Sequence, residues 1–355
     1  MHTRPNFWSS MLTLPPTHIK GVPLNLQASV KAVLFASLHF IPSTYTPNSF
    51  QLTRVLKGDT LHEAVGWLPF ILDWPTAAVA SALLHHGRRK GGGSFRRRRK
   101  RRDYVKLSGG AGTLGMSAAR ALLEHGASGC CLWDLESTLR SSQAEMLSLA
   151  KDFPKARVFG VAVDVTDSTA VAEGVQSVVQ TLGSIEHLFC FAGIVGVVLA
   201  MEMTDVQWRK TLDVNTTGAF ICAQAAAKQM AKQGKGGCSI TLTASISAHR
   251  VNYPQPQVAY NVSKAAVVAL KSSLAAEWAA HGIRVNSISP GYMDTILNAG
   301  EGSIQLARES WATRNPMGRM GAVGELDGVC VLLASRAGSY INGADMVIDG
   351  GTTVF

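Results

Sequence analysis

The sequence predicts an α/β fold in which residues 103–355 form one doubly wound, seven-stranded parallel sheet. From Val105 onward, short apolar runs alternate with amphipathic stretches, which is typical of repeated βαβ units. A glycine-rich turn, Ser108–Gly115, also lies between the first apolar run and the first amphipathic stretch. Such a turn between a strand and a helix is typical of a parallel α/β domain that binds a dinucleotide.

The apolar runs and amphipathic stretches alternate through to the C-terminus. The predicted strands are Val105–Ser108, Gly129–Asp134, Val158–Asp164, His187–Ala192, Cys238–Thr243, Arg284–Ser289 and Asp345–Ile348. The predicted helices are Leu114–His125, Ser137–Asp152, Thr169–Leu182, Val206–Lys232, Tyr260–His281 and Glu325–Ser335. Thr204 and Gln207 have the spacing of a capping box before the fourth helix.

The remainder of the chain differs in composition. Residues 1–87 show no regular period and contain eight prolines, so we expect a poorly structured extension of unknown role. Ten basic residues in the Gly- and Arg-rich linker 88–102 equal the formal net charge of +10, so the remainder is neutral. A neutral body argues against nucleic-acid binding. The stretch Ala64–Leu84 is interrupted by prolines and an aspartate, so no membrane span is expected.

Two further features bear on the compartment. The six cysteines lie in apolar runs without metal-ligand spacing, so we expect buried thiols in a reducing compartment and no metal site. We expect a cytoplasmic protein. The absence of acidic residues before Asp59 leaves organelle targeting by the extension as the alternative.

The glycine turn predicts a cofactor site. Gly109 and Gly115 allow the backbone to approach a pyrophosphate, which the N-terminus of the following helix attracts. Asp134 ends the second strand nineteen residues beyond Gly115, where an acid binds the adenosine ribose hydroxyls and repels a 2'-phosphate. This favours NAD over NADP. Asp164 is a candidate for the adenine amino group, or a turn residue.

Tyr260 and Lys264 place a phenol and an ammonium one turn apart on the same helix face. A free phenol has a pKa of about 10, which a neighbouring cation lowers, so such a tyrosine can exchange a proton with an alcohol. On their own, the two residues are also compatible with an exposed helix pair.

Together these motifs resemble the short-chain dehydrogenase/reductase family over about 250 residues. The family's glycine motif is present as Ser108, Gly109 and Gly115, with Leu114 where isoleucine is usual. Two departures are Thr113 in place of the middle glycine and Phe191 in place of the asparagine before Ala192 and Gly193. Both departures put tight cofactor binding in question without affecting the catalytic residues.

The resemblance implies further site residues. Asn215 would support a proton relay, and Ser245 would bind the substrate oxygen, with Ser247 as the alternative serine. Ala192, Gly193, Met293 and Thr295 would contact the cofactor with the residues above, and Tyr260 and Lys264 would contact it as well as catalyse the reaction. Asp349 and the two following glycines match the family's C-terminal signature.

The resemblance implies hydride transfer between a nicotinamide and a secondary alcohol or ketone, in a homotetramer. The loops around Asn252, Gln255 and Gln257 resemble those of fungal polyol dehydrogenases, such as D-arabinitol 2-dehydrogenase and sorbose or L-xylulose reductases, so a polyol and ketose pair is the expected substrate. The alternatives are an NADPH-dependent reductase of 3-oxoacyl or other apolar ketones, and a non-catalytic dinucleotide-binding scaffold.

Overall fold

The computed structural model describes residues 103–295 and 303–354. The extension 1–87 and the linker 88–102, including the stretch Ala64–Leu84, lie outside the described residues. In the described part, no helix combines the length and the apolar character needed to cross a bilayer.

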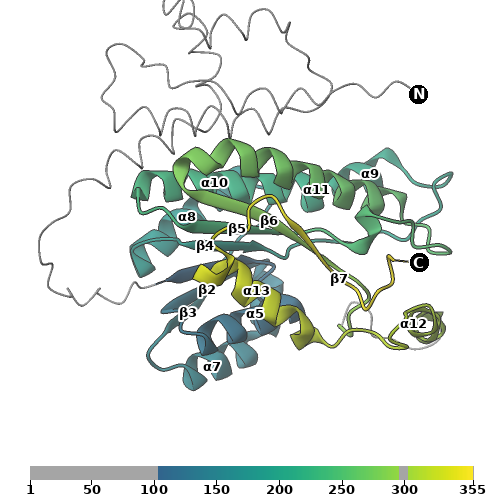
Figure 1. Ribbon diagram of the computed structural model, residues 1–355, viewed down its shortest axis with the longest axis horizontal. Helices are drawn as coiled ribbons and strands as arrows, with labels where there is room; N and C mark the ends of the chain where they lie inside the picture. The colour runs from purple at the N-terminus through teal and green to yellow at the C-terminus, as the bar shows by residue number, and fades with distance from the viewer. Residues whose placement is uncertain (1–102, 296–302, 355) are drawn as a thin grey trace, which may run out of the picture. The chain divides into compact units, whose positions relative to one another are not determined.

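Seven parallel strands form one sheet in the order β3-β2-β1-β4-β5-β6-β7 (Figure 1). Their bounds are β1 Tyr104–Ser108, β2 Gly129–Asp134, β3 Arg157–Ala162, β4 His187–Cys190, β5 Cys238–Thr243, β6 Ile283–Pro290 and β7 Asp345–Ile348. The predicted doubly wound sheet is confirmed, and β2, β5 and β7 have the predicted bounds. The strands β3 and β4 end two residues earlier than predicted, so Asp164 and Ala192 lie in loops.

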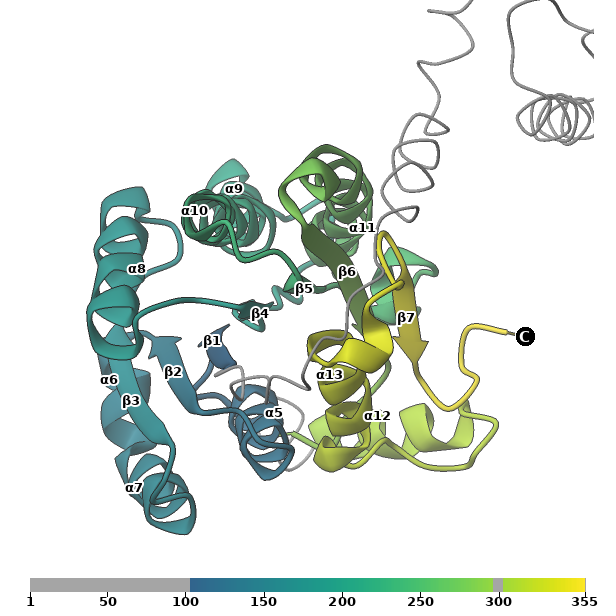
Figure 2. The ribbon, with the colours of Figure 1, turned by 60° about the vertical axis from the view of Figure 1, so that its left-hand side comes forward.

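Helices cover both faces of the sheet (Figures 1 and 2). On one face lie α8 Ser168–Leu182, α9 Asp205–Leu212, α10 Gly218–Gln233 and α11 Val258–Trp278. On the other face lie α5 Thr113–Glu124, α6 Glu136–Ser141, α7 Gln143–Asp152 and α13 Asp327–Ala334. Each face has its own apolar core, because alternate residues of a strand point to opposite sides.

Two predicted helices are interrupted in the structure. The stretch Ser137–Asp152 forms two helices, α6 and α7, which meet at Ser142, whose hydroxyl donates to the carbonyl of Ala111 (3.0 Å). The stretch Val206–Lys232 is divided by a π-helical segment, η2 Asp213–Thr217, between α9 and α10. Both interruptions coincide with contacts between distant parts of the chain, which helical periodicity does not report.

Three other elements refine the prediction. The capping box of Thr204 and Gln207 is confirmed at the start of α9. The predicted helix Tyr260–His281 begins at Val258 and ends in a 3-10 turn, η4 Ala279–His281. A helix that was not predicted, α12 Ser303–Thr313, follows β6 near its carboxyl end.

The six cysteines are free and buried, as predicted. Cys131, Cys190 and Cys222 belong to the core between the sheet and the helices α8, α10 and α11. The run Ala225–Ala227 in the predicted helix Val206–Lys232 is small enough for a partner helix to approach closely, but Ala226 is fully buried in this same core. A charge at Ala226 would therefore test folding rather than assembly.

Candidate active site

The candidate site lies at the carboxyl ends of the central strands. The chain crosses from β1 to β2 on one side and returns on the other side of β1 to β4, so the connections after these strands diverge. A crevice at such a reversal is where ligands bind in open α/β sheets. The Ser108–Gly115 turn, the Phe191–Gly193 loop and the segments after β5 and β6 all follow strands that end there.

Tyr260 and Lys264 project from the first half of α11. Lys264 is 3% exposed, and its Nζ lies 5.5 Å from the centroid of the Tyr260 ring. The same ammonium donates a hydrogen bond to the carbonyl of Thr243, at the end of β5 (2.8 Å). Burial lowers the pKa of Lys264 to about 8. The sheet therefore holds Lys264 in place, and Tyr260 and Lys264 are not an exposed pair on the surface of the helix.

Ser245 reaches Tyr260 across fifteen residues of sequence. The two side chains are hydrogen-bonded, which lowers the pKa of Tyr260, although burial raises that pKa more strongly. Ser247, the alternative serine, lies 3.2 Å from Ser245 between their hydroxyl oxygens. Its oxygen also accepts hydrogen bonds from Asn252 and Gln257. Ser247 is thus part of a polar network behind Ser245, and Ser245 is the serine that contacts the tyrosine.

Asn215 lies in the π-helical segment η2 and is 1% exposed. Its amide exchanges two hydrogen bonds with the main chain of Ile194, accepting from the N–H (2.8 Å) and donating to the carbonyl (2.9 Å). It also donates to Ser263 (3.0 Å), which in turn donates to the carbonyl of Tyr260. Asn215 therefore joins the loop after β4 to the helix that carries Tyr260 and Lys264. A π-helical turn inside a helix is frequent at functional sites.

The glycine turn fits a dinucleotide. A side chain at Gly109 would come 2.4 Å from the main-chain nitrogen of Ala192, and one at Gly115 would come 2.4 Å from the carbonyl of Gly109. The turn therefore packs too closely for side chains. The helix α5 begins at Thr113 without any side-chain cap, so its first N–H groups can receive a pyrophosphate. Thr113 stands where a glycine is usual and is partly exposed at this end.

The two acidic candidates differ in their surroundings. Asp134 is at the end of β2, and its carboxylate accepts hydrogen bonds from the N–H groups of Ala111 (3.3 Å) and Leu135 (3.0 Å). It thus lies beside the glycine turn, where burial raises its pKa. Asp164 is exposed and accepts two hydrogen bonds from Thr166, which is a turn arrangement.

The remaining predicted contacts lie around Lys264. A side chain at Gly193 would come 3.3 Å from Asn215 and 3.5 Å from the Lys264 ammonium. Met293 and Thr295 are buried in the segment that follows β6. Among the described residues, no group of three or more histidines, cysteines or acids has the geometry of a metal site.

The structure adds residues that the sequence motifs did not single out. Ser263 links Asn215 to Tyr260, and only its position beside Lys264 marked it in the sequence. Tyr292 follows the Pro290-Gly291 turn and stacks on Trp311 of α12, with ring centroids 4.3 Å apart. The Tyr292 hydroxyl donates to Gln255 (2.6 Å). No signal predicted the Trp311 contact, because α12 itself was not predicted.

Comparisons with known proteins agree with this geometry. Residues 109–353 match the family model described as "Enoyl-(Acyl carrier protein) reductase". The chain is 39% identical to the NADP-dependent mannitol dehydrogenase of Hypocrea jecorina, over 70% of this chain and 91% of that protein. It is 36% identical to sorbose reductase sou1 of Schizosaccharomyces pombe, over 69% of this chain and 93% of that protein.

Solved structures show the same relationship. A short-chain type dehydrogenase/reductase from Mycobacterium marinum matches with a TM-score of 0.66 and 38% identity, over 71% of this chain and 95% of that chain. The glycine turn at the head of α5 and the Ser245, Tyr260 and Lys264 contacts agree with the family match over residues 109–353. The chain belongs to the short-chain dehydrogenase/reductase family of NAD(P)-dependent oxidoreductases that act on alcohols and ketones.

Proposed function

We propose that this enzyme interconverts a polyol and the corresponding ketose, such as D-arabinitol and a pentulose. The observation that carries the proposal is the buried Lys264 ammonium, which lies 5.5 Å from the centroid of the Tyr260 ring, with Ser245 lowering the pKa of the same tyrosine. The printed names of relatives support the substrate class, since they include mannitol dehydrogenase, sorbose reductase and galactitol 2-dehydrogenase. Asn252 and Gln257 donate to Ser247 behind Ser245, and Gln255 accepts from Tyr292, so in this proposal they position the residues that meet the hydroxylated chain.

Each residue has a separate task in the proposed reaction. Bound NAD(P) supplies or accepts the hydride at the carbinol carbon. Ser245 donates a hydrogen bond to the substrate oxygen, and Tyr260 exchanges the proton with that oxygen. Lys264 stabilises the phenolate and binds the cofactor ribose. Asn215 supports the relay as a positioning residue, because its amide is already engaged by Ile194 and Ser263.

Acid–base behaviour gives the direction of the pH dependence. Burial raises the pKa of Tyr260 above 10, so the ligand-free enzyme holds the phenol form at neutral pH. The phenol is the form needed to protonate the oxygen of a ketone during reduction. Alcohol oxidation requires the phenolate. We therefore expect the rate of alcohol oxidation to rise with pH over the range in which the rate of ketone reduction falls.

The cofactor site extends around the glycine turn. We propose contacts from Gly109, Leu114 and Gly115 to the diphosphate and from Asp134 and Asp164 to the adenosine. Ala192, Gly193, Met293 and Thr295 would complete the site toward the nicotinamide.

The preferred cofactor is NAD in our proposal, although the names of the relatives favour NADP. Asp134 carries the argument, because a carboxylate beside the glycine turn accepts ribose hydroxyls and repels a 2'-phosphate. Replacing Asp134 by Ala should weaken the use of NAD. The ratio of kcat/KM with NAD to kcat/KM with NADP should fall by about tenfold. Wild-type preference for NADPH would contradict this role of Asp134.

The function is tested by a coupled panel read by NADH absorbance. The panel holds C5 and C6 polyols with NAD and NADP, the matching ketoses with NADH and NADPH, and a 3-oxoacyl thioester with both reduced cofactors. Polyol turnover supports the proposal, and thioester reduction alone supports the apolar-ketone alternative. Cofactor binding without turnover of any substrate would favour the non-catalytic scaffold.

We also propose a cytoplasmic homotetramer in which α10 and α11 contact their counterparts across a two-fold axis. Phe220 on α10 is 36% exposed and Val262 on α11 is 42% exposed, which supports an outward apolar face. Because a two-fold contact repeats each change, Val262→Glu should dissociate the assembly in light scattering. Leu147→Glu on α7, across the sheet, is the matched control. A monomeric wild type would contradict the proposal.

A further inference from the structure

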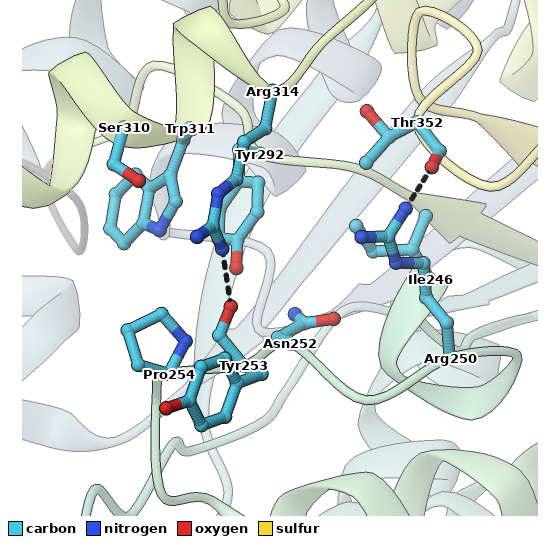
Figure 3. Close-up of a pocket in the computed structure, with 10 residues that line it drawn as sticks. All are labelled: Ile246, Arg250, Asn252, Tyr253, Pro254, Tyr292, Ser310, Trp311, Arg314 and Thr352. Atoms are coloured by element: carbon cyan, nitrogen blue, oxygen red, sulfur yellow. Dashed lines mark hydrogen bonds between the residues drawn. The ribbon is translucent and has the colours of Figure 1, made fainter. Parts of the chain in front are cut away.

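Among the residues that the structure describes, a pocket beside the candidate active site is lined by two arginines and no acid. Its walls come from the segment after β5, from the Pro290-Gly291 turn, from α12 and from the C-terminal loop. The lining residues are Ile246, Arg250, Asn252, Tyr253, Pro254, Tyr292, Ser310, Trp311, Arg314 and Thr352. Arg250 and Arg314 are the charged residues among these described lining residues (Figure 3).

Hydrogen bonds connect this pocket to the catalytic residues. Asn252 of the pocket wall donates to Ser247 (2.9 Å), whose oxygen lies 3.2 Å from that of Ser245. Ile246 lies between the two serines in sequence and faces the pocket. The pocket wall is therefore joined to Ser245 through Asn252 and Ser247.

The arginines keep unused donors. Arg250 donates to the carbonyl of Thr352, and Arg314 donates to the carbonyl of Tyr253 (2.6 Å). A guanidinium has five N–H donors, so each arginine retains others. Arg284 contrasts with them, because its two terminal nitrogens are each bonded to a main-chain carbonyl (3.0 and 2.6 Å).

Three acids in the neighbouring segments are paired with other cations. Asp294 is paired with Arg308 (2.7 Å), and Glu325 is paired with Arg319 (2.6 Å). Asp345 is paired with His249 (2.8 Å). Neither Arg250 nor Arg314 takes part in an ion pair among the described residues. Within the described ranges 103–295 and 303–354, the two arginines of the pocket therefore carry positive charge that no ion pair compensates.

The stacked rings of Tyr292 and Trp311 form a flat apolar wall between these polar groups. Such a wall excludes water from one side of a ligand, which strengthens the interaction of a guanidinium with an anion. Arginine also binds carboxylates and phosphates with two parallel hydrogen bonds, which a neutral hydroxyl cannot match.

We propose that this pocket binds an anionic group, a carboxylate or a phosphate ester, at the far end of the hydroxylated substrate. The preferred substrates are then sugar acids or polyol phosphates rather than neutral polyols. The inference rests on the proposed function, because it extends the substrate of the same site. Arg314 and Arg250 are its specificity-determining residues.

Binding is measured first, by calorimetry on the full chain with three probes, D-sorbitol, D-gluconate and D-sorbitol 6-phosphate. We expect at least one anion to bind about ten- to a hundredfold more tightly than sorbitol. The stronger of the two anions identifies the carboxylate or the phosphate as the group recognised. Equal binding of the neutral and both anionic probes would overturn the inference.

Substitutions then assign the effect to the arginines. Arg314→Gln and Arg250→Gln should each reduce the anion preference about tenfold, whereas Arg209→Gln, on the exposed surface of α9, should not change it. Arg314 is exposed, so its replacement should leave the fold intact, and thermal melting checks this. Arg314→Lys should lose part of the preference, because it keeps the charge without the planar fork. A preference that survives both Gln substitutions contradicts the proposal.

Turnover of the same probes with NAD separates this inference from the proposed function. Anion-selective binding without turnover of any probe would contradict the proposed reaction and leave the anion pocket supported. Turnover of neutral polyols without any anion preference would support the reaction and overturn the pocket assignment.

Discussion

Two buried lysines on the same side of the sheet have similar titration behaviour and different surroundings. Lys264, near the candidate active site, and Lys106, in the middle of β1, are both almost fully buried, and burial lowers the pKa of each to about 8. Lys264 donates to Thr243 and lies beside Tyr260. The Lys106 ammonium has no hydrogen-bond partner and lies 3.0 Å from the centroid of the Trp133 ring.

The comparison teaches that a lowered pKa does not by itself identify a functional group. Val105 and Leu107 point into the core beneath α5 and α13, so Lys106 points into the opposite core among Cys131, Cys190 and Cys222. There it meets apolar surfaces and thiols, and one of these thiols, Cys190, also interacts with Lys264. We infer that Lys264 is used in the reaction and that Lys106 mainly reduces stability.

The largest expected effect on activity is at Tyr260, the residue beside Lys264. Tyr260→Phe should lower kcat by about 10²- to 10⁴-fold, because the proton transfer is lost while the ring still packs. Cofactor binding, followed by NADH fluorescence, should remain close to wild type. Full activity in Tyr260→Phe would remove the reason for treating Lys264 differently from Lys106.

Replacing the two lysines in the same way sharpens the comparison. Lys264→Met should lower kcat by about 10²- to 10³-fold, because a preorganised cation beside the developing charge is removed. Lys106→Met should retain wild-type kcat and KM. Comparable losses in both variants would show that the core beside β1 also takes part in catalysis.

The pH dependence of stability provides the second contrast. A buried lysine whose pKa falls from 10.5 to about 8 costs on the order of 3 kcal/mol at neutral pH. The contact with Trp133 offsets up to about 2 kcal/mol of this cost. Lys106→Met should therefore raise the free energy of unfolding at pH 7 by about 1–3 kcal/mol, measured by urea denaturation.

The direction of this pH dependence follows from proton binding to Lys106 in the folded and unfolded states. Between pH 8 and 10.5 the unfolded lysine is protonated and the folded one is not, so the wild type gains stability as pH rises. The advantage of Lys106→Met should shrink across this window. An advantage that is constant up to pH 10.5 would show that packing, not charge, is responsible.

The smallest effect is expected in a control lysine. Lys271 is 5% exposed, and its ammonium donates to the carbonyl of Gly343 (2.8 Å). Lys271→Met should lower the free energy of unfolding by about 1 kcal/mol, because a buried carbonyl loses its donor. A gain in stability here would mean that methionine packs better than lysine at any buried position.

The local features of the site could be predicted from the sequence. Tyr260 and Lys264 are four residues apart, and the helix pitch places them on one face whatever surrounds them. The glycines of the cofactor turn and Asp134 at the end of β2 were also recognisable, because strand, turn and helix follow each other directly. The roles of these residues in catalysis and cofactor binding stay predictions.

Other features could not be predicted from local pattern. The π-helical turn at Asn215 depends on the main chain of Ile194, twenty-one residues away. The sequence already favoured Ser245 over Ser247, but the contacts of Ser247 with Asn252 and Gln257 could not be predicted. The alanines of α10 looked suited to a partner helix, but Ala226 packs into the protein's own core.

The sequence by itself determined the order of strands and helices along the chain. The signals for that order, which are the periodicity of apolar residues and the turn glycines, each act over a few residues. It also determined which residue types were available for the reaction. Only the tertiary structure decided which of them meet. The sheet brings Thr243 to Lys264 and places Arg250 and Arg314 around one pocket, although sixty-four residues separate the two arginines. Such contacts depend on the order of the strands within the sheet and on the loops that follow the strands, and no local periodicity encodes either.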